Sequence, residues 1–237
     1  MRRFFTGEEI TKSFVLQGFE AHHIKNVLRL KPGDSLTLCD GKGYDYNAVI
    51  QGFAGDGVLL DCEKPVLNDS EPRIHTSLYL AYTKSERLDY AVQKSVELGV
   101  RQIFLFSSER CVALHSDKRL ERLRRIGYEA AKQSGRAVLP QVCYLGNIAA
   151  ALMAERDPAA RKLFCYELET RSIRTSLVNL PAKVDIMCGP EGGFTAKEAI
   201  FATKTGWTSV SLGKRILRAE TAPITALSLV MYEAREI

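Results

Sequence analysis

Two stretches near the carboxyl end of the chain combine closely spaced glycines with charged residues. The first is Gly189-Pro-Glu-Gly-Gly-Phe194, and the second is Leu212-Gly-Lys-Arg-Ile-Leu-Arg-Ala-Glu-Thr221. Because glycine has no side chain, a bound molecule can approach the backbone closely, and glutamates and arginines can stabilise charge on it. These residue types at this spacing indicate loops that hold a ligand and keep titratable groups beside it.

The elements around the two stretches place them at comparable positions. Residues 184–188 and 210–212 are short apolar runs typical of buried strands. After the first stretch, Thr195 followed by Glu198 predicts a capping box at the start of a helix; after the second, Pro223 is tolerated in a first helical turn. Two such strand–loop–helix units predict one site at the carboxyl ends of neighbouring parallel strands. Taken singly, each loop is equally compatible with an ordinary turn.

Several kinds of catalytic site are missing from the sequence. It has no His-Glu-x-x-His zinc motif, no Gly-x-x-x-x-Gly-Lys-Ser/Thr phosphate loop and no Gly-x-Ser-x-Gly nucleophile motif. The six cysteines are far apart without a Cys-x-x-Cys pair. The adjacent His22 and His23 would not share one face of a helix. We therefore expect no metal site, and we expect reduced cysteines in a cytosolic protein.

Composition and charge are those of a soluble globular protein, with 46% hydrophobic and 26% charged residues. No apolar run approaches the roughly 18 residues of a membrane span, and the first residues lack the apolar region of a secretion signal. The net charge of +5 is concentrated in residues 71–140, which contain 13 lysines and arginines against 8 aspartates and glutamates. A polyanionic partner would meet the protein there.

Residues 1–70 predict a small all-β domain. Short β-like runs at 35–39, 44–51 and 57–63 are separated by turn signals rich in glycine and aspartate, a spacing that suits a small barrel. One or two helical turns are expected at 19–27. Pro65 to Arg73, polar and with a proline near each end, is predicted to link this domain to a second one.

From residue 71 to 237 strands and helices alternate, which indicates a doubly wound α/β domain. One predicted helix, at 117–134, is rich in arginine and lysine. Such a helix is compatible with a plain solvated face, but Arg110 and Arg136 in the loops at its ends suit phosphate, because a guanidinium donates two parallel hydrogen bonds. The remaining predicted elements are strands at 77–82, 102–106, 142–145 and 163–167 and three helices: one capped by Ser85, one from Asn147 to about Arg156 and one from about Pro223 to Arg235.

Taken together in chain order, these motifs resemble the RsmE family of ribosomal RNA small-subunit methyltransferases. The resemblance covers nearly the whole chain and implies a PUA-like RNA-binding β-barrel over 1–70, followed over 71–237 by an α/β domain of the SPOUT class with a carboxyl-terminal trefoil knot. One departure is Pro223, where the family commonly has a small residue. Besides the two glycine-containing stretches, the matching motifs are His23-Ile-Lys-Asn-Val-Leu-Arg-Leu-Lys-Pro-Gly-Asp34, Gln93-Lys-Ser-Val-Glu-Leu-Gly-Val100, Ser108-Glu-Arg-Cys111 and Ala130-Ala-Lys-Gln-Ser-Gly-Arg136.

The resemblance also implies ligand, substrate and partners. The methyl donor would be S-adenosylmethionine, and the acceptor would be N3 of one uridine in 16S ribosomal RNA of the small subunit. Family members act as homodimers, and neither DNA nor a membrane is an expected partner. The implied RNA contacts are His23, Lys25, Arg29, Arg110 and Arg136. The implied donor-binding residues are Cys188, Gly189, Pro190, Glu191, Gly192, Gly193, Leu212, Gly213, Ile216, Leu217, Arg218 and Thr221.

Methyl transfer fits the missing motifs, because the sulfonium donor is already activated and needs mainly alignment with the acceptor. N3 must lose its proton, so Glu191 and Glu220 are candidate bases, and Arg136 or Arg218 is a candidate stabiliser of the resulting charge. Each glutamate is also compatible with a capping or ion-pair role. Two alternatives stay open: a non-catalytic RNA-binding or ribosome-assembly protein, and a 2′-O-ribose RNA methyltransferase of the same fold.

Overall fold

A computed structural model describes residues 2–154 and 157–237. The chain forms two compact units, one made of Met1–Glu71 with Ala131–Leu139, the other of Pro72–Ala130 with Pro140–Ile237. The sequence gives no sign that 131–139, in the middle of the chain, belong with the first unit. Among the residues described, no helix is long and apolar enough to cross a membrane.

The first unit is built on a six-stranded sheet. Its order is β1-β3-β4-β5-β2, with β1 parallel to β3, the other pairs antiparallel, and β6 paired to β4. The sequence predicts β3, β4 and β5, but β1 and β2 are too short to show a pattern. The strands are β1 (Arg3–Phe5), β2 (Ser13–Leu16), β3 (Ser35–Cys39), β4 (Tyr44–Ala54), β5 (Gly57–Cys62) and β6 (Val66–Leu67).

The helical turns predicted at 19–27 are α1 (Gly18–His22) and a π-helical turn (His23–Val27). The wider turn closes with a hydrogen bond from the Leu28 N–H to the His23 carbonyl oxygen at 2.9 Å. Ala21 and Ile24 are fully buried in the apolar core of the sheet. This packing leaves His22, Lys25 and Asn26 exposed, whereas Glu20 is buried.

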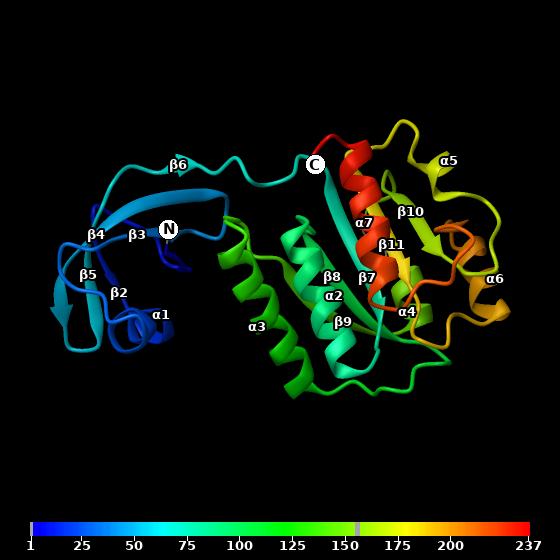
Figure 1. The fold of residues 1–237 in the computed structure, drawn as a ribbon, viewed down its shortest axis with the longest axis horizontal. Coiled ribbons are helices and arrows are strands. Elements are labelled where there is room, and N and C mark those ends of the chain that lie inside the picture. The colour runs from blue at the N-terminus through cyan, green and yellow to red at the C-terminus, as the bar shows by residue number, and fades with distance from the viewer. Residues whose placement is uncertain (1, 155–156) are drawn as a thin grey trace. The chain divides into compact units, whose positions relative to one another are not determined.

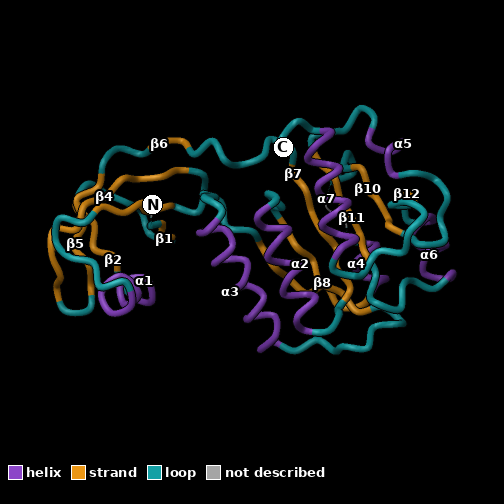
Figure 2. The backbone as a smooth tube through the Cα atoms, viewed as in Figure 1, coloured by secondary structure: helices purple, strands orange, loops and turns teal. Residues whose placement is uncertain are grey.

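The second unit contains an all-parallel sheet of six strands in the order β12-β10-β11-β7-β8-β9 (Figures 1 and 2). The predicted α/β alternation is confirmed. Strands β7, β8 and β11 are buried at their centres, as expected for a parallel sheet covered by helices, whereas the edge strands β9 and β12 are only partly buried. They are β7 (His75–Ala81), β8 (Gln102–Ser107), β9 (Gln141–Asn147), β10 (Arg161–Cys165), β11 (Lys183–Cys188) and β12 (Thr208–Val210).

Helices α2 to α6 connect these strands, and α7 follows β12 and packs against α2 and against strands β11 and β7, in front of the sheet in Figure 1. The predicted capping box is confirmed, since the Thr195 hydroxyl accepts from the Glu198 N–H and the Glu198 carboxylate accepts from the Thr195 N–H. Pro223 lies in the first turn of α7. The helices are α2 (Ser85–Glu97), α3 (Asp117–Gln133), α4 (Ile148–Met153), α5 (Ile173–Leu177), α6 (Ala196–Lys204) and α7 (Thr221–Glu233).

Three helices differ from the sequence prediction at their ends, among them α7, which runs from Thr221 to Glu233 and not from Pro223 to Arg235. Helix α2 begins at Ser85 with Lys84 in the N-cap position, one residue earlier than a cap at Ser85 would give. Helix α4 is capped as expected by the Asn147 side chain, which accepts from the Ala150 N–H, but ends at Met153. Its predicted end at Arg156 lies outside the described residues.

Candidate functional site

A pocket of about 450 Å³ lies in the second unit at the carboxyl ends of β10, β11 and β12. The sequence predicts β11 and β12 as neighbouring strands, and this is wrong: β10 pairs with both and lies between them. The two glycine-containing loops therefore stand on either side of the end of β10, whose Cys165, Tyr166 and Glu167 also line the pocket. We call residues 189–193 the first loop and residues 211–220 the second loop.

Eleven of the twelve residues implied as donor-binding line this pocket. They are Cys188, all five residues of the first loop, and Leu212, Gly213, Ile216, Leu217 and Arg218. The exception is Thr221, the exposed first residue of α7, which is not part of the lining.

The first loop requires glycine at positions where a β-carbon would lie too close to neighbouring side chains. Gly193 has a φ of +67°, and a β-carbon there would collide with the carboxylate of Glu167. A β-carbon on Gly189 would lie 3.0 Å from the ring of Phe194, which is buried against Phe164 at 4.3 Å between ring centroids. At Gly189 and Gly193 the loop packs too tightly for a side chain, so glycine at these two positions lets the backbone line the pocket.

The second loop is more exposed and strongly cationic. Gly213 turns the chain with a φ of +120°, and its N–H donates to the Ser211 hydroxyl at 3.2 Å. Beyond it Lys214, Arg215 and Arg218 are exposed, as is Ile216 at 86%. This aliphatic side chain lies out of the core, on the wall of the pocket.

Arg87, in the first turn of α2, connects the two loops. Its Nη1 lies 3.2 Å from Glu191 Oε1 of the first loop, and its Nε lies 3.9 Å from Glu220 Oε2 of the second. The Lys84 N–H also donates to Glu191 Oε1, at 3.0 Å. The sequence gives no signal for Arg87, because it lies on a helix about a hundred residues away from both loops.

Burial acts to raise the pKa of Glu191, but the hydrogen bond from the Lys84 N–H and the charge of Arg87 outweigh it, and the pKa is lowered from the ordinary 4.5. Glu191 is therefore ionised at neutral pH. The Oε2 atoms of Glu191 and Glu220 are buried and have no hydrogen-bond partner among the described residues.

All six cysteines are free thiols, and Cys165 and Cys188 meet at the pocket. A hydrogen bond to Cys165, together with burial, raises the pKa of Cys188 well above its ordinary value. A protonated thiol is a poor nucleophile, so Cys188 forms an apolar part of the pocket wall beside Cys165. Among the described residues no group of three or more histidines, cysteines or acids could hold a metal ion.

Arg110, implied as an RNA contact, forms hydrogen bonds within the second unit. Its Nη1 donates to the carbonyl oxygen of Gly192 at 2.9 Å and to that of Phe194 at 3.4 Å. A β-carbon on Gly192 would lie 3.0 Å from Cβ of Arg110. Arg110 thus lies against the outer side of the first loop and holds two of its carbonyl groups.

Arg136, implied as an RNA contact and as a stabiliser, lies in the first unit and not in the pocket lining. Only 2% of the residue is exposed, and its guanidinium donates twice to Glu71, from Nη2 at 2.8 Å and from Nε at 3.1 Å. Glu71 also accepts from the N–H groups of Ala137 and Val138. This glutamate belongs to the stretch predicted as a linker, which is therefore held in place here.

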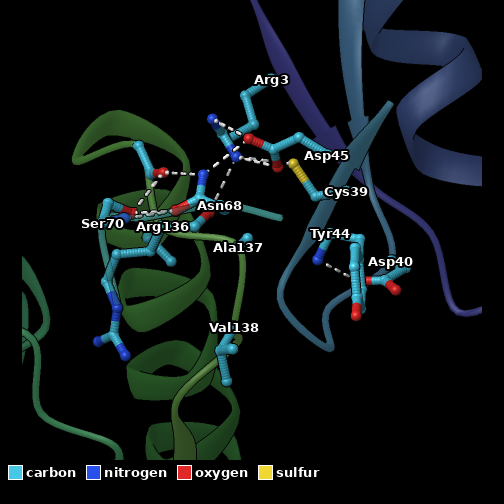
Figure 3. A network of polar contacts seen from close by, with 12 residues as sticks. Arg3, Cys39, Asp40, Tyr44, Asp45, Asn68, Ser70, Arg136, Ala137 and Val138 are labelled. Carbon is cyan, nitrogen blue, oxygen red and sulfur yellow. Dashed lines mark hydrogen bonds and ion pairs between the residues drawn. The ribbon is translucent and has the colours of Figure 1, made fainter. Parts of the chain in front are cut away.

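Figure 3 shows the polar network around this arginine's backbone. Arg3 binds Asp45 through both guanidinium nitrogens, at 2.6 and 2.8 Å, and Asn68 donates to the same carboxylate at 2.7 Å. Asn68 and Ser70 also donate to the carbonyl oxygen of Gly135. The network fixes residues 131–139 to the rest of the first unit.

The other implied RNA contacts also lie in the first unit, on or next to its helical segment. Lys25 is exposed and donates to the Gly55 carbonyl oxygen at 3.0 Å. Arg29 is exposed with a φ of +51°, and His23 is half-buried with Nδ1 3.7 Å from Glu20. These three residues share one segment, whereas Arg110 lies in the second unit.

Comparison with known proteins identifies both parts of the chain. A family model described as an RNA methyltransferase domain matches residues 70–231, and one described as an RNA methyltransferase PUA domain matches residues 16–60. The ribosomal RNA small subunit methyltransferase E of Bacillus subtilis is 31% identical, covering 98% of this chain and 97% of that protein. The protein of the same name from Synechocystis is 34% identical, covering 94% and 74%.

Solved structures agree over the full length. The crystal structure of a ribosomal RNA small subunit methyltransferase E from Neisseria gonorrhoeae, bound to S-adenosylmethionine, matches with a TM-score of 0.90 and 32% identity over 98% of this chain and 97% of that one. A putative methyltransferase from Legionella pneumophila with the same bound cofactor matches with a TM-score of 0.88 and 28% identity, covering 97% and 96%. The chain belongs to the family of ribosomal RNA small subunit methyltransferases E.

Proposed function

We propose that this protein transfers a methyl group from S-adenosylmethionine to N3 of a specific uridine in 16S ribosomal RNA of the small subunit. The observation that carries the proposal is the pocket between the first and second loops. Relatives that align with nearly the whole chain are named as ribosomal RNA small subunit methyltransferases, and one was crystallised with this donor.

The residues of the pocket fit the donor. Its volume of about 450 Å³ lies within the roughly 300–1,000 Å³ usual for small-molecule sites. Gly189, Gly192 and Gly193 leave backbone groups open to a polar ligand. Leu212, Ile216 and Leu217 offer apolar surface for the adenine, and the ionised Glu191 offers a negative charge near a cationic ligand. The donor supplies an activated methyl group on a sulfonium, so alignment is the main task left to the chain.

The contacts of the candidate catalytic residues support different roles for each of them. Glu191 is a weak base, because its pKa is lowered and its carboxylate is already held by Arg87 and by the Lys84 N–H. We assign it to the electrostatics of the donor site. Glu220 stays the candidate base for the N3 proton, and Arg218, exposed on the pocket wall, the candidate stabiliser of the uridine anion. Arg136, buried against Glu71, is assigned to holding the first unit together.

The remaining features of the proposal come from the family. Residues 1–70 would form the PUA-like barrel that binds RNA through His23, Lys25 and Arg29, and residues 71–237 the methyltransferase domain with its trefoil knot. The protein would act in the cytoplasm as a homodimer. Helix α7 exposes Leu229 and Tyr232, which supports a second copy as its partner.

The test is transfer of labelled methyl from S-adenosylmethionine to small subunits purified from cells that lack this protein, followed by nucleoside analysis. Label in 3-methyluridine is the expected result. Label in a ribose-methylated nucleoside would indicate the 2′-O-methyltransferase reaction instead. Donor binding without label would mean that another RNA is the substrate, and no donor binding at all would leave an RNA-binding protein without catalysis.

A further inference from the structure

We propose that Arg87 is a positioning residue for the donor pocket, which sets the two loops at the distance required for donor binding. The proposal rests on the proposed function, since it takes S-adenosylmethionine as the ligand of the pocket. It concerns a residue of α2, outside both loops.

The first observation is that one guanidinium serves two separate loops. Arg87 donates to Glu191 Oε1 at 3.2 Å, within hydrogen-bond range, and faces Glu220 Oε2 at 3.9 Å. Between the two loops lies the end of β10, so no strand pairing connects β11 directly to β12. The side chain of Arg87 therefore makes a link between the loops that the sheet does not make.

The second observation is the charge balance. The side chains of Glu191 and Glu220 are only 19% and 16% exposed. Two carboxylates near each other in low-dielectric surroundings repel each other unless a cation lies between them. Arg87 supplies this cation, at 3.2 Å from Glu191 and 3.9 Å from Glu220, and so offsets the repulsion.

The third observation is that the two contacts differ in length. The contact between Arg87 and Glu191 is short enough for a hydrogen bond. The contact between Arg87 and Glu220, at 3.9 Å, is an ion pair without a hydrogen bond. A ligand that draws the second loop inward would shorten this distance, and Arg87 would then favour the closed arrangement. Since a ligand shifts an equilibrium only through its different affinity for the two states, loss of Arg87 should appear as weaker donor binding.

The experiment compares Arg87→Ala and Arg87→Lys with Lys94→Ala. Lys94 is on the same helix and pairs with Glu97 at 2.8 Å, away from the pocket, so it controls for loss of a surface ion pair on α2. Binding of S-adenosylmethionine is measured by calorimetry, and KM for the donor and kcat by methyl transfer to small subunits.

We expect Arg87→Ala to raise Kd and KM for the donor about tenfold, equivalent to about 1.4 kcal/mol, with kcat at saturating donor changed less than about threefold. Arg87→Lys should recover part of the affinity, because an ammonium keeps the charge but lacks the fork that reaches two acids. Lys94→Ala should bind donor like the unmodified protein.

A double-mutant cycle tests the link itself. If Arg87 acts on the second loop through Glu220, then Arg87→Ala and Glu220→Gln together should cost less donor affinity than the sum of the two single changes. Additive losses would overturn the link. Should Arg87→Ala fold poorly, Arg87→Lys and Glu220→Gln allow the same cycle.

The outcomes separate the two proposals. If the unmodified protein does not bind S-adenosylmethionine, the proposed function fails. If the unmodified protein binds it and Arg87→Ala binds it equally well, only the role of Arg87 fails. A fall in kcat with unchanged KM would also overturn that role, because it would mean that Arg87 acts on the reacting atoms.

Discussion

The guanidinium of Arg110 donates to the carbonyl oxygen of Gly192 at 2.9 Å, so a residue of the β8–α3 connection supports the first loop from outside. An arginine in a loop at the end of a basic helix suggests contact with phosphate. Its recorded hydrogen bonds go instead to the carbonyl groups of Gly192 and Phe194.

Replacing Arg110 by alanine is predicted to weaken donor binding by roughly three- to tenfold, because two charge-assisted hydrogen bonds to the loop are lost at an exposed site. Calorimetry with S-adenosylmethionine measures this. Arg122→Ala, which removes an exposed arginine that pairs with Asp89, is the matched control. Normal donor affinity combined with weaker binding of ribosomal RNA would return Arg110 to the role that the sequence suggested.

Replacing Gly193 by alanine is predicted to abolish measurable donor binding. The residue needs a positive φ, and the added β-carbon would collide with Glu167, so the loop must move. Gly206→Ala is the control, since Gly206 also has a positive φ but nothing lies within 4 Å of an added β-carbon. Thermal unfolding of both variants checks that they fold, and full donor affinity of Gly193→Ala would show that the loop adapts.

The lowered pKa of Glu191 predicts a pH dependence of stability. A carboxyl group whose folded-state pKa is depressed stabilises the protein above its unfolded pKa, near 4.5, and this contribution is lost as pH falls through the folded-state value. Glu191→Gln should therefore be less stable than the unmodified protein at neutral pH, and the difference should shrink below pH 4.5. Urea unfolding of both proteins over this range measures it; a difference that does not change with pH would contradict the assignment.

Breaking the buried pair between Arg136 and Glu71 is predicted to destabilise the first unit. Arg136→Ala leaves the Glu71 carboxylate without its cation, which typically costs about 3–5 kcal/mol in the free energy of unfolding. Lys183→Ala removes a much more exposed pair with Asp157 and should cost far less. If Arg136→Ala keeps its stability but loses RNA binding, the arginine contacts RNA directly.

The sequence predicts the individual helices and strands well, but it predicts less well which strands lie next to each other in the sheet. Short-range signals such as the Thr195–Glu198 box, the Asn147 cap and the alternation after residue 71 are confirmed, because each depends on residues a few positions apart. The position of β10 between β11 and β12 is not encoded in any local pattern, since it follows from how the whole sheet assembles. Arg87 is missed for the same reason.

Glu167 illustrates an intermediate case. Its place at a strand end is visible in the sequence, but which strand end faces the first loop depends on the sheet order. In the structure the carboxylate fills the space that a side chain on Gly193 would need. A sequence pattern could suggest that a polar residue lies near the site, but not which glycine it faces.

Strand β10, which lies between the strands that precede the two loops, limits the size of the molecules that can contact both loops. Neighbouring strands are about 4.8 Å apart, so two loops that follow strands separated by one other strand start roughly 10 Å from each other. Near these starting points a compact anion such as phosphate would reach one loop at a time, whereas farther along the loops Glu191 and Glu220 both approach one guanidinium. An elongated molecule lying across the end of β10 can contact both loops. The spacing of the strands therefore sets a minimum length for the ligand, independently of the side chains that bind it.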